Sequence, residues 1–294
     1  MPAQPVAPTS SYGSADLTSA VRFFRHPVAG VVTVVLSMFA MILGSGLISA
    51  GFYLLVAWIT GERAEGGLRT TLQIASYVTT TVIAVLLIML WRRLAQLPMR
   101  GFGLVPLSRA WLLIPGFGLA VGVNYASAAT AVAAGASTWG QPRFDTVLII
   151  TVITIFFGQA FPEELLWRGH LSNLLARRLR AVAVIATTSL AFGSMHIVSH
   201  SSAQSLGEQL LYVLQGTGLG FLTIAMRYGT ASLWMAVGFH TGYNAFFEAA
   251  APVTGNYGVE LLTRAVLLAV CATLVLFVRR FRRRADRDFG EAAP

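Results

Sequence analysis

Long apolar runs alternate with short polar segments along almost the whole chain. Each run is about 20 residues or longer, the length that a helix needs to cross the hydrocarbon core of a bilayer. The runs occupy residues 29–58, 70–91, 110–134, 146–168, 181–200, 208–226, 230–250 and 258–278. This pattern predicts an all-α fold, namely a polytopic transmembrane helical bundle with about eight spans.

The polar segments between the runs are too short to hold a soluble domain, so residues 29–279 are predicted to form one transmembrane domain. Residues 1–28 begin with a stretch rich in Pro, Ala, Ser and Thr, without the basic start and apolar core of a signal peptide. That composition predicts a disordered cytoplasmic tail. Residues 280–294 are predicted to form a second, basic tail on the same side.

The composition agrees with a membrane protein. The chain is 55% hydrophobic and 11% charged, whereas a soluble domain carries about 25% charged residues. All 21 basic residues are arginine, and the net charge of +9 could suit nucleic acid. The arginines, however, are spread between the apolar runs, where basic residues set membrane orientation. We therefore expect the lipid bilayer, and no nucleic acid, as a partner.

Arginine placement also predicts the orientation. With a cytoplasmic N-terminus, the inner segments would hold most arginines, and the outer segments only Arg63, Arg69, Arg143 and Arg264. Such an excess of basic residues marks the cytoplasmic side. The sequence thus predicts a multi-pass protein of the cell membrane with both termini in the cytoplasm.

The single cysteine, Cys271, excludes an internal disulfide and a cysteine-based metal site.

The fourth run ends in the segment 157–170, which carries Glu163, Glu164 and Arg168 among apolar neighbours. An ionisable residue inside the bilayer costs about 2.5–3.5 kcal/mol and indicates a functional site by default. The alternative is a helix that has reached the interface and is becoming polar. Leu165, Leu166 and the following tryptophan favour the first interpretation, because they keep the segment apolar around its charges.

Two further runs carry polar residues at helical spacing. The fifth contains Phe192 and His196, and the seventh contains His240 and Asn244. A lone buried histidine is more often a satisfied core residue than a catalytic one. Three polar clusters on three helices, at similar distances along the chain from the predicted cytoplasmic turns, indicate instead one shared site.

Local geometry divides the roles of the two glutamates. Glu164 and Arg168 are four residues apart in the favourable order, so we expect them to pair. Successive helical residues point about 100° apart, which leaves Glu163 freer to face a water. Pro162 removes one helical hydrogen bond, so we expect a kink and a free carbonyl at Gly158.

The residues on the other two helices have more open roles. His240 and Asn244 share a face and could orient a water, polarise a carbonyl or stabilise an oxyanion. Phe192 could pack against the His196 ring or face lipid. His200 is interpreted as an interface or packing residue.

Together, Glu163-Glu164-x-x-x-Arg168-Gly169, Phe192-x-x-x-His196 and His240-x-x-x-Asn244 resemble the motifs of CPBP intramembrane proteases. That family includes CAAX prenyl endopeptidases and bacteriocin-processing or Abi-type proteins. The resemblance covers roughly residues 145–250. It implies that Glu163 activates a water, aided by both histidines and Asn244. We count Glu164 as a further candidate catalytic residue. In that scheme Arg168, Phe192 and Pro162 are structural support. Trp167 stands where the family commonly has Phe or Tyr.

The resulting hypothesis is an intramembrane endopeptidase that hydrolyses a membrane protein or peptide. No cofactor is predicted outright. Two histidines and a glutamate could ligate Zn²⁺ with an open position, but a metal-free glutamate mechanism uses the same residues. The alternatives are a non-catalytic membrane scaffold or immunity-type binding protein, and a transporter. The Arg-, Ala- and Gly-rich composition suggests a bacterial source, where a prenylated C-terminus is not the expected substrate.

Overall fold

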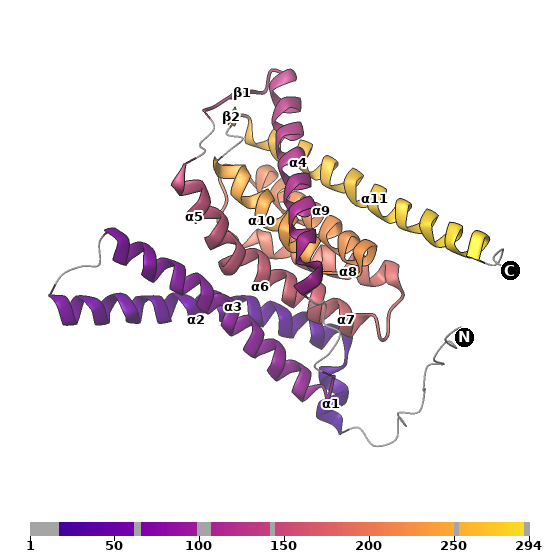
Figure 1. Cartoon of the computed structure of the whole chain (residues 1–294), viewed down its shortest axis with the longest axis horizontal. Coiled ribbons are helices and arrows are strands. Elements are labelled where there is room, and N and C mark those ends of the chain that lie inside the picture. Colours follow the sequence, from indigo (N-terminus) through magenta and orange to yellow (C-terminus); the bar gives the residue numbers. More distant parts are fainter. Residues whose placement is uncertain (1–17, 62–65, 99–106, 142–144, 250–252, 291–294) are drawn as a thin grey trace.

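The computed structural model describes residues 18–61, 66–98, 107–141, 145–249 and 253–290. These residues form a helical bundle with one short two-stranded ribbon (Figure 1). The helices are α1 (Ser19–Phe24), α2 (Pro27–Thr60), α3 (Gly66–Leu94), α4 (Leu113–Ala133), α5 (Thr146–Ile155), α6 (Phe161–Glu164), α7 (Ser172–Leu175), α8 (Ala181–Ser194), α9 (Leu206–Thr230), α10 (Trp234–Ala249) and α11 (Tyr257–Gly290). The strands are β1 (Ser137–Trp139) and β2 (Val253–Gly255), which pair antiparallel.

The polytopic helical bundle predicted from the sequence is confirmed. Within the described ranges, six helices are long and apolar enough to cross a membrane, and they cover Pro27–Thr60, Gly66–Leu94, Leu107–Ala133, Thr146–Leu175, Leu206–Thr230 and Tyr257–Arg280. The remaining two predicted spans correspond to shorter helices. One is α8 with the 3₁₀ turn that extends it to Ile197, and the other is α10.

The predicted disordered tail extended too far into the chain. Residues 1–17 lie outside the described part, but helix α1 already begins at Ser19. Its start is capped by Thr18, whose hydroxyl accepts a hydrogen bond from the Val21 amide at 3.4 Å. The His26 side chain caps α2 in the same way, and Pro27 occupies the first helical position, where it lacks only an amide that would be unpaired anyway. These local helix signals outweigh the Pro- and Ser-rich composition of the preceding residues.

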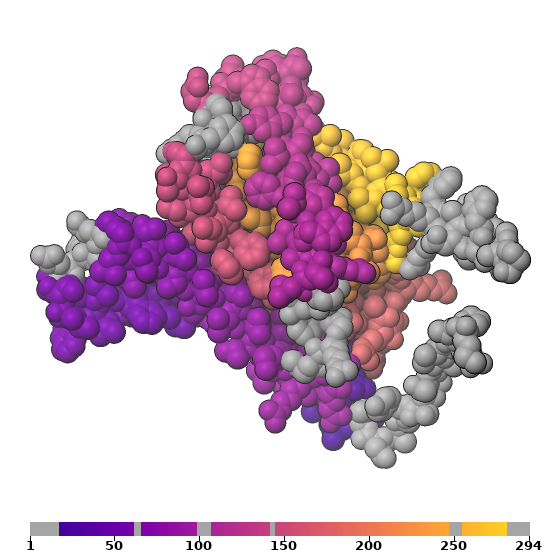
Figure 2. All heavy atoms as spheres, in the orientation of Figure 1, coloured from indigo at the N-terminus to yellow at the C-terminus, as the bar shows by residue number. Residues whose placement is uncertain are grey.

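Helices α2 and α3 form a hairpin that extends away from the rest of the bundle (Figure 1). The space-filling view shows the same hairpin protruding at one side (Figure 2). Its inner half packs against the segment 165–175, where Val34 and Met41 of α2 are buried. Its outer half is apolar and unpartnered, with Leu47 75% and Trp58 82% exposed. Such a surface suits lipid.

The other side of the bundle is held together by close helix crossings. Helix α9 packs along α8 and α11, and α10 packs along α4. Glycines permit the α4–α10 contact: a Cβ on Gly116 would lie 2.2 Å from the Met235 carbonyl oxygen, and one on Gly238 would lie 2.2 Å from that of Leu113. Small residues allow this approach in membrane bundles. The crossing positions α10 beside the fourth span, where the charged residues lie.

Candidate active site

The fourth span is a helix without a break, but two of its segments, Phe156–Ala160 and Leu165–Leu171, are π-helical. The Phe161 amide donates to the Phe156 carbonyl, five residues earlier. The irregularity expected at Pro162 therefore takes the form of a π-helical register, a feature often found at functional sites. The Thr81 hydroxyl of α3 donates to the Phe157 carbonyl at 2.5 Å. The carbonyl that takes an outside partner is thus that of Phe157, and the free carbonyl expected at Gly158 stays a prediction.

Glu164 is fully buried and holds two partners. Its Oε1 atom lies 3.0 Å from Nη1 of Arg168, which confirms the predicted ion pair. The same oxygen lies 3.0 Å from Nδ1 of His240. A carboxylate can only accept a hydrogen bond, so Nδ1 carries the proton in this contact. Glu164 consequently fixes the orientation of the His240 ring.

Phe192 lies at the centre of the site. The Arg168 guanidinium carbon is 4.3 Å from the centre of its ring, the geometry of a cation–π contact. The ring also makes edge contacts with His196 at 5.2 Å and with His240 at 6.0 Å between ring centres. Phe192 is 2% exposed. It therefore packs against both imidazoles, and the lipid-facing alternative is excluded.

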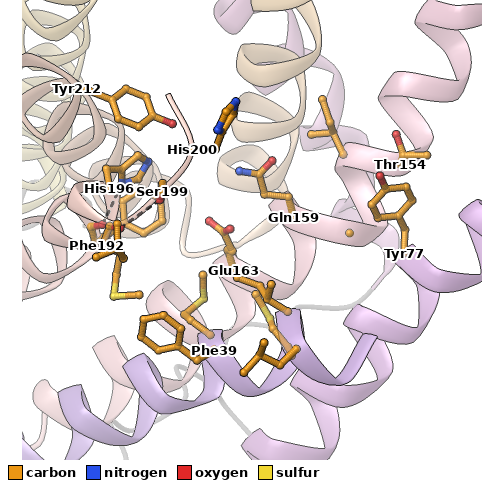
Figure 3. A pocket seen from close by; sticks show the side chains of 18 residues that line it. Phe39, Tyr77, Thr154, Gln159, Glu163, Phe192, His196, Ser199, His200 and Tyr212 are labelled. Carbon is orange, nitrogen blue, oxygen red and sulfur yellow. Dashed lines mark hydrogen bonds between the residues drawn. The ribbon is translucent and has the colours of Figure 1, made fainter. Parts of the chain in front are cut away.

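Glu163 differs from its neighbour in that its carboxylate reaches open space. The side chain is 11% exposed, and its Oε2 atom lies 3.9 Å from Nε2 of His240. It lines a cavity of about 620 Å³ together with His196. In Figure 3 the Glu163 carboxylate lies between His196 on one side and Gln159 on the other. The two adjacent glutamates are thus separated into one that faces the cavity and one that is enclosed in protein.

The cavity has two chemically distinct walls. The apolar wall comes from α2 and consists of Met38, Phe39, Met41, Ile42 and Leu43. The opposite wall carries polar groups from three other segments, namely Thr154, Gln159, Glu163, His196, Ser199, His200 and Tyr212. A peptide held between these walls would meet hydrogen-bonding groups on one side only.

Helix α9 holds His196 in place. His196 lies in the 3₁₀ turn after α8, and its carbonyl accepts a hydrogen bond from Gln209 Nε2 at 2.8 Å. One turn further along α9, the Tyr212 ring makes an edge contact with the imidazole at 5.1 Å. At Gly216, an added Cβ would lie 2.7 Å from Nδ1 of the histidine. The absence of a side chain at Gly216 is therefore what lets the imidazole lie against α9.

This clustering of motifs on adjacent helices coincides with a match to a known family. Residues 145–246 match the family model described as type II CAAX prenyl endopeptidase Rce1-like. We refer to this segment, about a third of the chain, as the Rce1-like domain. The resemblance inferred from the motifs is thereby confirmed, and the domain contains every predicted site residue. No curated protein matches the chain.

Within the Rce1-like domain, Asn244 is the predicted site residue that the structure separates from the others. It lies on α10 one turn after His240 and is half-buried. It is not among the residues that line the cavity, and no hydrogen bond within the described ranges joins it to the cluster. Its catalytic role stays a prediction.

The Rce1-like domain also contributes cavity residues that the sequence analysis did not select. Gln159 is exposed to the cavity and has no hydrogen-bond partner in the described part of the chain. Its amide inside an apolar run, four residues before Glu163, is a signal that could have identified it. His200, interpreted from the sequence as an interface or packing residue, also lines the cavity. Tyr212 carries no motif, and only the structure identifies it.

The question of a metal was left open by the sequence. Within the ranges that the structure describes, no group of three or more His, Cys, Asp or Glu side chains is arranged to hold a metal ion. Glu163 and Glu164 both lie beside His240, at 3.9 and 3.0 Å. Glu164 already uses one oxygen for Arg168 and for His240 Nδ1.

Proposed function

We propose that this protein is an intramembrane endopeptidase that hydrolyses peptide bonds of a membrane-associated protein or peptide with a water activated by Glu163. The match to an Rce1-like family supports the reaction class. Glu163 is assigned as the base because the two glutamates lie in different surroundings. Glu163 lines the cavity, whereas Glu164 is enclosed by Arg168 and His240.

In the proposed reaction, Glu163 takes a proton from water while the resulting hydroxide adds to the peptide carbonyl. The protonated Glu163 then gives its proton to the leaving amine, and the C–N bond breaks. Because Glu164 accepts a hydrogen bond from Nδ1–H of His240, the Nε2 atom faces Glu163, 3.9 Å away. His240 and His196 are proposed to orient the water and to stabilise the oxyanion. Asn244 is proposed to assist, as the family resemblance implies.

The cavity favours an enzyme over a non-catalytic scaffold. In a scaffold, the charged cluster would only have to hold the helices together. Every charged side chain could then be buried and paired with another. Here one carboxylate of the cluster is left facing a cavity large enough for a peptide segment, next to a polar wall. No comparable observation favours a transporter.

A direct test uses purified protein in lipid vesicles with a panel of single-span peptides, and mass spectrometry to identify the products. The wild type should cleave at least one peptide, and Glu163→Gln should cleave none while unfolding at the same temperature. Glu208→Gln is the matched control, because Glu208 lies at the start of α9 and does not line the cavity. It should cleave as the wild type does. Undiminished cleavage by Glu163→Gln would refute the proposed role of this residue.

A further inference from the structure

A second groove adjoins the catalytic cavity, between α2 and α3. It encloses about 460 Å³. Three residues, Ile42, Tyr77 and Gly158, line both spaces. The remaining lining is mostly small or hydroxyl-bearing and consists of Ser45, Gly46, Ser49, Ala50, Tyr53, Ser76 and Thr80.

The hydroxyl groups in this groove contrast with the surface around it. The outward side of α2 is apolar, with Leu47 75% and Leu54 72% exposed. In the groove, Ser45 and Thr80 donate to backbone carbonyls of their own helices, at 3.1 and 3.3 Å. The Ser49 and Ser76 side chains have no hydrogen-bond partner among the residues that the structure describes. Both remain able to donate to a bound molecule.

The two spaces meet at a close contact. A Cβ on Gly158 would lie 2.3 Å from Cδ1 of Tyr77, so the tyrosine ring lies directly against the backbone of the π-helical segment. Gly158 precedes Glu163 by five residues. A polypeptide that passed the Tyr77 ring would therefore lead from the groove to the carboxylate proposed as the base.

We propose that the α2–α3 groove binds the membrane-embedded segment of the polypeptide substrate, in an extended conformation, next to the bond that is cleaved. This inference rests on the proposed endopeptidase function. An extended chain has unpaired carbonyls, which cannot be left in hydrocarbon without a donor. The Ser49 and Ser76 hydroxyls supply such donors. A lipid acyl chain has no polar atom to pair with them, so a polypeptide is the occupant that fits.

Two glycines on α2 provide a matched pair of variants. At both Gly46 and Gly51 an added Cβ would point into open space, with no atom of another element within 4 Å, so both positions suit a bulky substitution. Only Gly46 lines the groove. We compare Gly46→Trp with Gly51→Trp on two probes: a short quenched-fluorescence peptide that spans the cleaved bond, and the same peptide extended by an apolar segment long enough to enter the groove.

Gly46→Trp should raise the KM of the extended probe about tenfold, the scale of a lost apolar contact in a binding pocket. The kcat, and both constants for the short probe, should not change. Gly51→Trp should behave as the wild type with both probes. The double variant Ser49→Ala and Ser76→Ala should weaken binding of the extended probe alone, without adding bulk.

The outcomes separate this inference from the proposed function. Unchanged KM for the extended probe in Gly46→Trp would overturn the groove assignment, while Glu163-dependent cleavage of the short probe would leave the endopeptidase intact. An equal loss of cleavage efficiency with both probes in Gly46→Trp would also overturn the groove assignment. It would indicate that the groove binds lipid or that the substitution changes the helix hairpin. If the wild type cleaves neither probe, both proposals fail together.

Discussion

Nδ1 of His240 lies 3.0 Å from Oε1 of Glu164, the same oxygen that pairs with Arg168. A histidine from the seventh predicted span is thereby oriented by a carboxylate from the fourth. The contact directs the opposite ring nitrogen toward Glu163. The structure thus links the two glutamates through one imidazole, and it indicates why adjacent glutamates should respond differently to substitution.

Replacing Glu164 should affect stability as well as activity. Glu164→Ala would leave the Arg168 guanidinium buried without its carboxylate partner, at a cost of about 3–5 kcal/mol. Glu163→Ala removes no comparable pair, so it should abolish cleavage and leave the unfolding temperature near that of the wild type. Thermal unfolding in detergent and cleavage assays on both variants measure the difference. A stable but inactive Glu164→Ala beside a fully active Glu163→Ala would reverse the assignment.

The Thr81 hydroxyl should stabilise the π-helical register before Pro162. Thr81→Val keeps the shape of the side chain but leaves the Phe157 carbonyl without its donor, and should cost about 1–3 kcal/mol. Cleavage should also fall, because Glu163 follows this segment directly. Thr79→Val is the control, since Thr79 donates only to Ala75 of its own helix. Similar losses of stability and activity in both variants would show that the contact with the fourth span has no special role.

Gly216 should be essential for the position of His196. Gly216→Ala would place a methyl group 2.7 Å from the imidazole Nδ1 atom, so the ring must shift within the cavity. We expect a kcat at least about tenfold lower, the scale of a catalytic group displaced from its working geometry. Gly207→Ala, on the same helix, would bring its Cβ no closer than 3.8 Å to a neighbour and should be fully active. A normal kcat in Gly216→Ala would exclude His196 from the reaction.

Much of the fold could be predicted because the spans are defined by apolar length, and each predicted run corresponds to a helix. The Glu164–Arg168 pair was also predictable, since four-residue spacing on a helix determines it. The π-helical segment Phe156–Ala160 was not, because no local pattern records that a threonine from a distant helix donates to one of its carbonyls. The roles of Tyr212 and Gly216 depend on how closely α9 approaches the His196 turn, which no local pattern records.

Both termini are expected on the cytoplasmic side, because arginines concentrate at the turns on that side. A reporter fused after residue 294 should report an internal location, and one inserted at residues 201–206 an external one. Accessibility labelling of intact cells measures both. An external C-terminus would require an odd number of spans and a different depth for the cluster.

Substrate conformation should limit the rate of cleavage. A helical peptide hides its carbonyls in hydrogen bonds, so attack by a water at Glu163 requires an extended segment in the cavity between the α2 wall and the polar wall. One apolar peptide should be presented in vesicles in two forms, as a continuous helix and with a Gly-Pro break near its inner end. The break disrupts the helix locally, so the broken form should be cleaved faster. Glu163→Gln should cleave neither form, which separates hydrolysis at this site from background proteolysis. Faster cleavage of the continuous helix would contradict this account and would mean that the enzyme itself unwinds its substrate before hydrolysis.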